Sequence, residues 1–273
     1  MIAIKTLRDF TENIPLAWAE GTNAKLINPI PTNQALPKDE YFMFGILRGS
    51  GDIYKRCELN NYSFYYADHP YFTNSKNPKH SCFRITKNGH SNPVIINRPN
   101  DRYLKFKSEE TKNWNKNGKH ILICPPSIFI QVFDQAFDWL SKTIEIIKKN
   151  SDRKILINEK KLSSEISKKI NLKLPPINEE YSNNPLGFDL SNAWCLVTYN
   201  SMASLSALIN GIPVFTNSYK CAAYNLAEKD FSKIENPIYP DNRELLFNSL
   251  AYSQFTLDEM KSGYAFKILN ENN

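Results

Sequence analysis

The chain has 273 residues, of which 41% are hydrophobic and 23% are charged. These proportions are those of an ordinary globular protein and exclude a chain that is disordered or coiled coil throughout. The longest apolar run, Ile121 to Ile130, is broken by two prolines and a serine and is shorter than the about 18–20 residues that cross a bilayer. Five charged residues among the first twenty argue against a signal peptide.

Cysteine usage and charge distribution indicate the compartment of the protein and the charge of its partner. The five cysteines form no CxxC pair, which favours a reducing compartment and argues against a disulfide scaffold or a structural zinc site. We therefore expect a cytoplasmic protein of a bacterium or of a phage-infected host. The net charge is +6, and its excess concentrates in residues 76–119, which hold 11 basic and 3 acidic side chains. The first half of the chain is thus expected to face an anion.

In the first half, hydrophobic spacing predicts a helix over residues 4–20, kinked at Pro15, followed by a proline-rich loop over 22–40. Continuous apolar runs predict three strands, with a short helix between the first two. A polar linker follows. The strands are expected at 41–47, 63–67 and 82–86, the short helix at 52–58 and the linker at 108–119.

In the second half, strands and helices alternate, which predicts parallel βαβ units and an open sheet. The strands are expected at 120–124, 153–157, 194–198 and 213–215, and the helices at 129–149, 161–170, 201–210, 243–252 and 256–268. The change in character near the linker indicates two domains, residues 1–115 and residues 116–273. The predicted fold class is therefore α/β.

The strand, turn and helix from Trp194 to Phe215 form the clearest candidate binding site. The strand ends at Thr198, Asn200 or Ser201 can cap the helix, and Ser204 lies in its first turn. Free backbone N–H groups at such a helix start favour an anion, and a diphosphate suits them. Ligands of open α/β sheets bind at the carboxyl ends of the strands. The alternative is a plain capped helix in a Rossmann-like core.

Three motifs resemble one family. The pattern N-S-x-x-S-L-x-A-L-x-x-G-I-P-V, from Asn200 to Val214, is similar to the donor-site segment of GT-B glycosyltransferases, closest to the capsular-polysaccharide (Kdo transferase) type and its short bacteriophage relatives. Residues 250–263, LAYSQFTLDEMKSG, resemble the C-terminal motif of the same proteins. Residues 65–72, YYADHPYF, followed by FRITKN at 83–88, resemble a third stretch of the phage relatives.

This resemblance implies a GT-B-like fold, in which two Rossmann-like domains with parallel sheets face each other across a cleft. Residues 1–115 would bind the acceptor. Residues 116–273, including the C-terminal helices, would bind a nucleotide sugar, with a UDP-sugar as the expected co-substrate and a CMP-sugar as the other option. One departure matters: Ser206 stands where many of these enzymes carry Glu, so any hydroxyl contact made by that Glu is lost or moved.

The candidate catalytic pair is Asp68 and His69, which close a buried strand of the first half. If the reaction inverts configuration, the acceptor hydroxyl must lose its proton as it attacks, and a carboxylate or an imidazole can take it. The alternative is structural, with Asp68 capping a turn and His69 packing beside Pro70. There is no DxD motif and the histidines are dispersed, so we expect no metal.

Further polar residues flank or follow other predicted strands. Ser127 and Lys154 are candidate donor contacts, Lys154 as one of several cations that would neutralise the diphosphate. Arg48 and Gly49 form a small turn suited to phosphate, although a tight structural turn explains it better.

Two acceptors compete. Hydroxymethylated bases of phage DNA would explain the basic region, because lysine and arginine clusters bind phosphates and release counterions. The expected phosphate contacts are Arg84, Lys87, Arg98 and Arg102, joined by Lys105 and Lys107. The alternative acceptor is a capsule or lipopolysaccharide glycan. A third interpretation is a non-catalytic module that binds nucleic acid or sugar.

Overall fold

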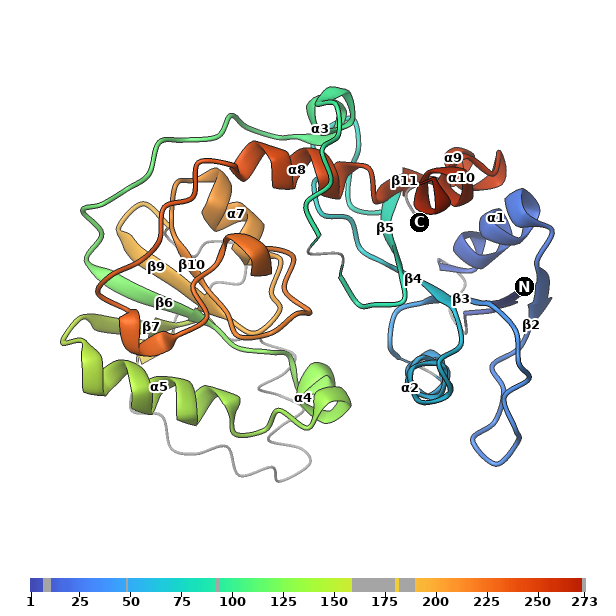
Figure 1. Cartoon of the computed structure of the whole chain (residues 1–273), viewed down its shortest axis with the longest axis horizontal. Helices are drawn as coiled ribbons and strands as arrows, with labels where there is room; N and C mark the ends of the chain where they lie inside the picture. The colour runs from blue at the N-terminus through green and yellow to red at the C-terminus, as the bar shows by residue number, and fades with distance from the viewer. Residues whose placement is uncertain (7–10, 48, 92–93, 159–179, 182–189, 272–273) are drawn as a thin grey trace. The chain divides into compact units, whose positions relative to one another are not determined.

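A computed structural model describes residues 1–6, 11–47, 49–91, 94–158, 180–181 and 190–271. The chain divides into two compact units (Figure 1). Unit 1 comprises Met1–Ser108 and Phe247–Asn273, and unit 2 comprises Glu109–Leu246.

Unit 1 is built on a six-stranded sheet, sheet A, in the order β11-β5-β4-β3-β1-β2. Strands β1 to β4 are parallel, β5 runs antiparallel to β4, and β11 runs antiparallel to β5. The strands are β1 (Ile2–Ile4), β2 (Lys25–Ile27), β3 (Tyr41–Phe44), β4 (Phe64–Asp68), β5 (Cys82–Lys87) and β11 (Gln254–Thr256). The parallel part has a doubly wound order whose direction reverses between β1 and β3.

Helices cover both faces of sheet A (Figure 1). On one face Trp18 is fully buried and stacks on Phe42 with ring centroids 4.5 Å apart, within a core that also includes Met260 and Ile268. On the other face Tyr54 packs its ring edge against Phe64. The helices of the first face are α1 (Asn13–Thr22), α9 (Leu257–Lys261) and α10 (Tyr264–Asn270); α2 (Ser50–Asn60) covers the second, and α3 (Asp101–Phe106) lies in the basic region.

Unit 2 is built on a parallel five-stranded sheet, sheet B, in the order β10-β9-β6-β7-β8. In chain order this is 3-2-1-4-5 read from β8, which is the Rossmann arrangement, and the strand order reverses between β6 and β9. The strands are β6 (His120–Cys124), β7 (Lys154–Ile157), β8 (Glu180–Tyr181), β9 (Ala193–Thr198) and β10 (Val214–Phe215).

Alternate residues of these strands face opposite sides of sheet B, as the pleat requires. Ile121, Ile123 and Val197 form a core with Trp139 and Ile147 of α5. Figure 1 shows α5 and α7 on opposite sides of the sheet. The helices are α4 (Ile128–Asp134), α5 (Trp139–Asn150), α7 (Ala203–Ile209) and α8 (Arg243–Ala251), with short turns η2 (Tyr224–Leu226) and η3 (Phe231–Lys233). Helix α8 begins in unit 2 and ends in unit 1.

Several predicted elements are confirmed, above all the strands of sheet B, while others are wrong. The expected helix over 4–20 is strand β1 followed by α1, because Ile2–Ile4 pairs with β2 and β3 at the same time. The expected helix over 129–149 is two helices, separated where Gln135 takes a φ of +55°. Strand β5 is antiparallel. The helix expected over 161–170 lies outside the described residues.

The domain division also differs from the expected one. The C-terminal segment, expected in the second domain, belongs to unit 1. The cause is pairing: β11 adds an edge strand to sheet A, with Phe255 opposite Phe83, and α9 and α10 then pack on α1. Within the described residues, no helix is long and apolar enough to cross a bilayer.

Candidate functional site

The carboxyl edge of sheet B holds every predicted donor residue except Lys154. By this edge we mean the ends of β6, β9 and β10, at Cys124, Thr198 and Phe215, with the residues that follow them. Thr198 is fully buried there. Its hydroxyl donates to the Cys124 carbonyl at 2.7 Å and accepts the Ser201 N–H at 3.1 Å. Thr198 therefore joins the two strand ends and positions the turn, and its contact with a ligand stays a prediction.

The start of α7 does not offer the free N–H groups that the sequence predicted. The Ala203 N–H donates to the Ser201 hydroxyl at 3.2 Å, and the Ser204 N–H donates to the Ser201 carbonyl at 3.1 Å. The Ser204 side chain is fully buried and donates to the same carbonyl at 2.8 Å. Ser204 is thus a structural residue, and the predicted phosphate cradle is already occupied by the chain itself.

Three predicted donor residues remain available at this edge: Ser127, Asn200 and Ser201, each half-buried. Ser127 precedes α4 without capping it through its side chain. Neither the Ser127 hydroxyl nor the Asn200 amide makes a hydrogen bond within the part of the chain that the structure describes. The β6 and β9 ends carry these groups at the point where the strand order reverses, which is where ligands of such sheets bind.

The structure adds residues after β10 that the sequence did not single out. Thr216 donates to the Tyr199 carbonyl at 3.1 Å, and the indole N–H of Trp139 donates to Asn217 Oδ1 at 3.0 Å. Lys220 forms an ion pair with Asp134, a nearly buried carboxylate at the end of α4. Strand β10 is short, and the sequence after it shows no motif or periodicity, so these residues could not be predicted from the sequence.

Lys154 is placed at the opposite edge. It begins β7 and pairs with His120, at the start of β6, so it lies one strand length from Cys124. The prediction that it neutralises a donor phosphate at the carboxyl edge is wrong, because a parallel sheet keeps strand starts and strand ends on opposite edges.

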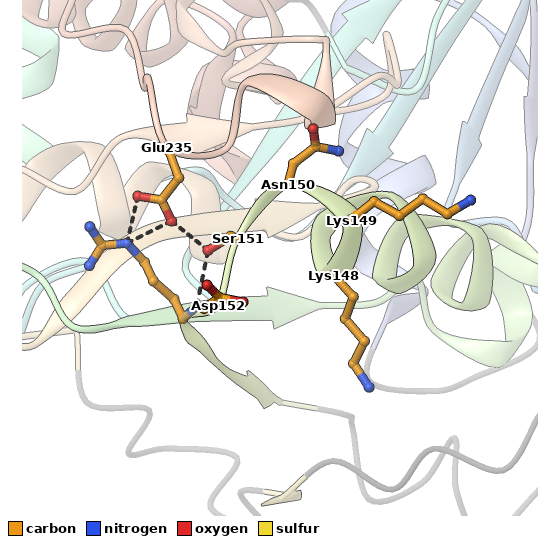
Figure 2. A pocket seen from close by; sticks show the side chains of 7 residues that line it. Lys148, Lys149, Asn150, Ser151, Asp152 and Glu235 are labelled. Atoms are coloured by element: carbon orange, nitrogen blue, oxygen red, sulfur yellow. Dashed lines mark hydrogen bonds and ion pairs between the residues drawn. The ribbon is translucent and has the colours of Figure 1, made fainter.

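Beside Lys154, a polar depression of about 580 Å³ opens at this amino edge (Figure 2). Arg153 is held in it by Glu235 at 3.0 Å, by the Gly118 carbonyl at 2.8 Å and by the ring of Trp194. The Arg153 guanidinium is therefore engaged within the chain, where it holds the start of β7 in place. The lining residues are Lys148, Lys149, Asn150, Ser151, Asp152, Arg153 and Glu235.

In unit 1, Asp68 ends β4 with each carboxylate oxygen engaged. Oδ2 accepts from the Tyr66 hydroxyl at 2.7 Å and from Arg84 Nη2 at 2.9 Å, and Oδ1 accepts the His69 N–H at 2.7 Å. Burial raises the pKa of Asp68, but Arg84 and the hydrogen bonds outweigh it and lower the pKa to about 2. Asp68 is therefore ionised at neutral pH and is a weak base.

His69 has the complementary character. Burial lowers the pKa of its imidazole below the usual 6.5, so the ring is neutral at pH 7. Its Nδ1 is buried and has no hydrogen-bond partner among the described residues. The ring lies edge-on to Phe44 and to His80, with centroids 6.1 and 5.8 Å away. A neutral imidazole with an unused nitrogen can accept a proton.

Two of the predicted phosphate contacts are structural cations. Arg84, only 4% exposed, forms the ion pair with Asp68, whose side chain is partly exposed. Arg102, 6% exposed, binds both oxygens of Glu259, at 2.8 and 3.0 Å, and donates to the Ala251 carbonyl. Both side chains are almost fully buried and paired with carboxylates, so they are poor candidates for contact with a DNA phosphate.

The remaining basic candidates differ among themselves. Lys87 donates to Asn270 Oδ1 at 2.6 Å, and Arg98 lies over the ring of Tyr252 at 4.8 Å. Gly49 is exposed, with a φ of +94°, at the start of α2, and Arg48 lies outside the described residues. Some of the basic side chains of residues 76–119 are thus engaged in contacts within the chain.

The C-terminal motif serves the fold of unit 1. Gln254 is fully buried, and its side-chain amide binds both backbone groups of Phe72. It accepts the Phe72 N–H at 3.0 Å and donates to the Phe72 carbonyl at 2.9 Å. Thr256 and Glu259 form a reciprocal capping box at the start of α9. The glutamine, threonine and glutamate of this motif are therefore explained by packing and capping.

Comparison with known proteins bears on the fold. No protein-family model and no curated protein sequence matches the chain. Among solved structures, the β-Kdo 2,7-transferase of KpsC from Thermosulfurimonas dismutans is similar, with a TM-score of 0.50 and 13% identity over 91% of this chain and 89% of that one.

The KpsC β-Kdo 2,4-transferase of the same organism covers 91% of this chain and 90% of its own, with 12% identity and a TM-score of 0.42. The accessory secretory protein complex 1, 2 and 3 of Streptococcus pneumoniae matches 86% of this chain and 48% of its own, with a TM-score of 0.30. The similarity to the 2,7-transferase, together with the two α/β units, one built on a parallel sheet and one on a largely parallel sheet, shows that the chain has a GT-B-like fold.

Proposed function

We propose that this protein is a glycosyltransferase that moves a sugar from a nucleotide-sugar donor to a hydroxyl of a surface glycan of the capsule or lipopolysaccharide kind. The observation that carries the proposal is the carboxyl edge of sheet B. There Thr198 joins β9 to β6 at the reversal of strand order, and Ser127 and Asn200 present polar groups that make no hydrogen bond with any described residue. The GT-B-like fold supports the same reaction class, because the similar KpsC structure is a Kdo transferase.

Unit 1 supplies the acceptor side in this proposal. Transfer with inversion requires a base for the acceptor hydroxyl. Of the predicted pair, His69 is the better base, since its ring is neutral, whereas Asp68 holds its negative charge down to a pH of about 2. Asp68 then acts as the residue that fixes Arg84 and the backbone of His69.

A surface glycan is favoured over DNA as the acceptor. The DNA hypothesis rested on the cations of residues 76–119, and Arg84 and Arg102 are buried ion pairs. The solved structure that supports the fold is a β-Kdo 2,7-transferase. A titration against duplex DNA at several salt concentrations separates the two, because several phosphate contacts would make the logarithm of the binding constant fall by about 0.9 per contact with the logarithm of salt.

The donor half of the proposal is tested by thermal shift with CMP, UMP, UDP and their sugar conjugates. A donor at 100 times its dissociation constant stabilises the folded chain by about 2.7 kcal/mol. Asn200→Asp places a negative charge beside the donor phosphates and is expected to weaken binding. Lys154→Ala, at the opposite edge of the sheet, is the matched control and should bind as the unchanged protein does. Equal affinity in all three proteins would refute the assignment of this edge.

A further inference from the structure

Two tyrosines, Tyr219 and Tyr224, follow β10 at the carboxyl edge of sheet B. Packing within the described residues does not account for the exposure of the Tyr219 ring. Tyr219 is 71% exposed, the largest exposed fraction among the aromatic side chains of the described residues. Its ring lies against that of Tyr224, with centroids 4.5 Å apart and planes inclined by 36°. Leaving a large aromatic ring in water forgoes the free energy of burial, and exposed aromatic groups of this kind mark binding surfaces.

The loop that carries this pair is rigid. The Ser218 N–H donates to the Thr216 hydroxyl at 3.3 Å, and the Cys221 N–H donates to the Ser218 carbonyl at 3.0 Å. Lys220, between the tyrosine and the cysteine, is anchored by its ion pair with Asp134. Lys229 lies over the ring of Tyr224, the less exposed member of the pair, at 5.1 Å. The Tyr219 ring is thus presented on a fixed support, which lowers the entropy lost when a ligand stacks on it.

The register of sheet B places this loop beside the donor residues. Phe215 pairs with Val197, so Thr216 and Asn217 run alongside Thr198 and Tyr199, and Thr216 donates to the Tyr199 carbonyl. The tyrosine pair therefore belongs to the same edge as Asn200, on the β10 side of β9. A ligand whose phosphates lie at the β6 and β9 ends can extend in this direction.

Asn217 adds a directed polar group. An indole N–H can only donate, so the atom that accepts from Trp139 at 3.0 Å must be the amide oxygen of Asn217. The amide NH₂ is consequently left on the exposed side, as a donor of fixed orientation. A flat aromatic surface in the same loop as an oriented N–H donor matches a nucleobase, which offers a π-face and carbonyl acceptors at its edge.

We infer that Tyr219 and Tyr224 form a stacking platform for the base of the nucleotide-sugar donor, and that the Asn217 amide donates to a carbonyl oxygen of that base. This inference rests on the proposed function, since it names the part of the donor that this side of the edge binds. It assigns base recognition to the loop after β10 rather than to the helix start after β9.

The test is calorimetric titration of the full chain with CMP and with UMP. Replacing the stacking residue, Tyr219→Ala, is expected to weaken binding of the preferred nucleotide by about 5- to 150-fold, the range that loss of one aromatic stacking partner gives. Tyr219→Phe keeps the ring and is expected to restore affinity to within about threefold. Ile146→Ala, another exposed apolar side chain of unit 2, is the control and should leave affinity unchanged.

The outcomes are distinct. If the nucleotide binds the unchanged chain and Tyr219→Ala binds it equally well, the platform is refuted while the donor site stands. If Tyr219→Phe loses as much as Tyr219→Ala, the hydroxyl and not the ring makes the contact, and stacking is refuted. If neither nucleotide binds the unchanged chain at millimolar concentration, the platform and the proposed function both fall. Saturation transfer to the base protons, stronger than to the ribose protons and lost in Tyr219→Ala, would support the proposal.

Discussion

At the scale of single residues, the same side chain can serve chemistry or packing, and its hydrogen-bond partners decide which. Thr198 and Ser204 lie in the predicted donor motif, yet both spend their hydroxyls on backbone carbonyls. Asp68 and His69 are neighbours in sequence, but Arg84 keeps one ionised while burial keeps the other neutral. Residue type and spacing carry no information on such partners.

The His69 assignment predicts a marked loss of turnover in His69→Ala, by about 10²–10⁴-fold, with donor affinity unchanged. Asp68→Asn is expected to lose turnover as well, because it weakens the contact that fixes Arg84 and leaves the loop less ordered. Steady-state rates with a glycan acceptor, paired with donor titration, check both variants. If His69→Ala keeps more than about a third of the rate, the base lies elsewhere.

The Asp68–Arg84 pair makes a second prediction, on stability. The pKa of Asp68 is depressed, so its contribution is complete above the usual value of 3.8 and is lost as the pH falls towards about 2. Arg84→Met leaves a carboxylate without its cation and is expected to cost about 3 kcal/mol at pH 7, at the lower end of such losses because 23% of the Asp68 side chain is exposed.

Urea unfolding at pH 7 and at pH 2.5 measures this effect. The difference in unfolding free energy between the unchanged protein and Arg84→Met should shrink at the lower pH, where Asp68 begins to take up a proton. A difference that stays constant with pH would mean that packing, and not the ion pair, holds Arg84.

At the scale of elements, close backbone approaches set the ends of helices and the course of the linker. Gly211 follows α7 with a φ of +73°, and a Cβ built there would lie 2.0 Å from the Asn113 carbonyl oxygen. The Lys112 N–H donates to the Ile209 carbonyl and the Asn115 N–H to the Gly211 carbonyl. The segment predicted as a polar linker is thus fastened to the end of α7.

Gly211→Ala is accordingly expected to destabilise the protein by more than Gly45→Ala. Gly45 has a similar φ of +67° but no atom within 4 Å of the position of a Cβ, so its substitution costs only the backbone strain, about 1–2 kcal/mol. The displacement of Asn113 adds about 1–3 kcal/mol to the loss for Gly211→Ala. Chemical denaturation of both variants measures the difference, and equal losses would show that the linker yields freely.

At the scale of the whole molecule, the C-terminus belongs to the sheet of the N-terminal half. Phe247–Asn273 joins unit 1, and its strand β11 covers the β5 edge of sheet A. Gln254, Arg102 and Glu259 then connect segments about 150 to 180 residues apart in sequence. Folding of unit 1 therefore requires both ends of the chain.

Removal of residues 253–273 should consequently unfold unit 1 and spare unit 2. Hydrogen exchange read by mass spectrometry distinguishes the units, since β3 and β4 should lose protection while β6 and β9 keep theirs. The division at residue 115 expected from the sequence makes the opposite prediction, with the loss falling on the second half.

Much of this protein follows from local sequence. The buried strands of sheet B and the βαβ alternation are visible as apolar runs and helical periodicity, because each depends on residues a few positions apart. The tertiary structure decided what depends on distant partners. Ile2–Ile4 is a strand because two neighbouring strands pair with it. Strand β11 belongs to sheet A because it pairs with β5. The tertiary structure buried Arg84 and Arg102 against Asp68 and Glu259, pairings that the sequence does not reveal, and it placed Lys154 at the edge of sheet B opposite Asn200. Charge and hydrogen-bonding capacity are properties of a residue, but whether they face a ligand or the interior is settled only when the chain has closed around them.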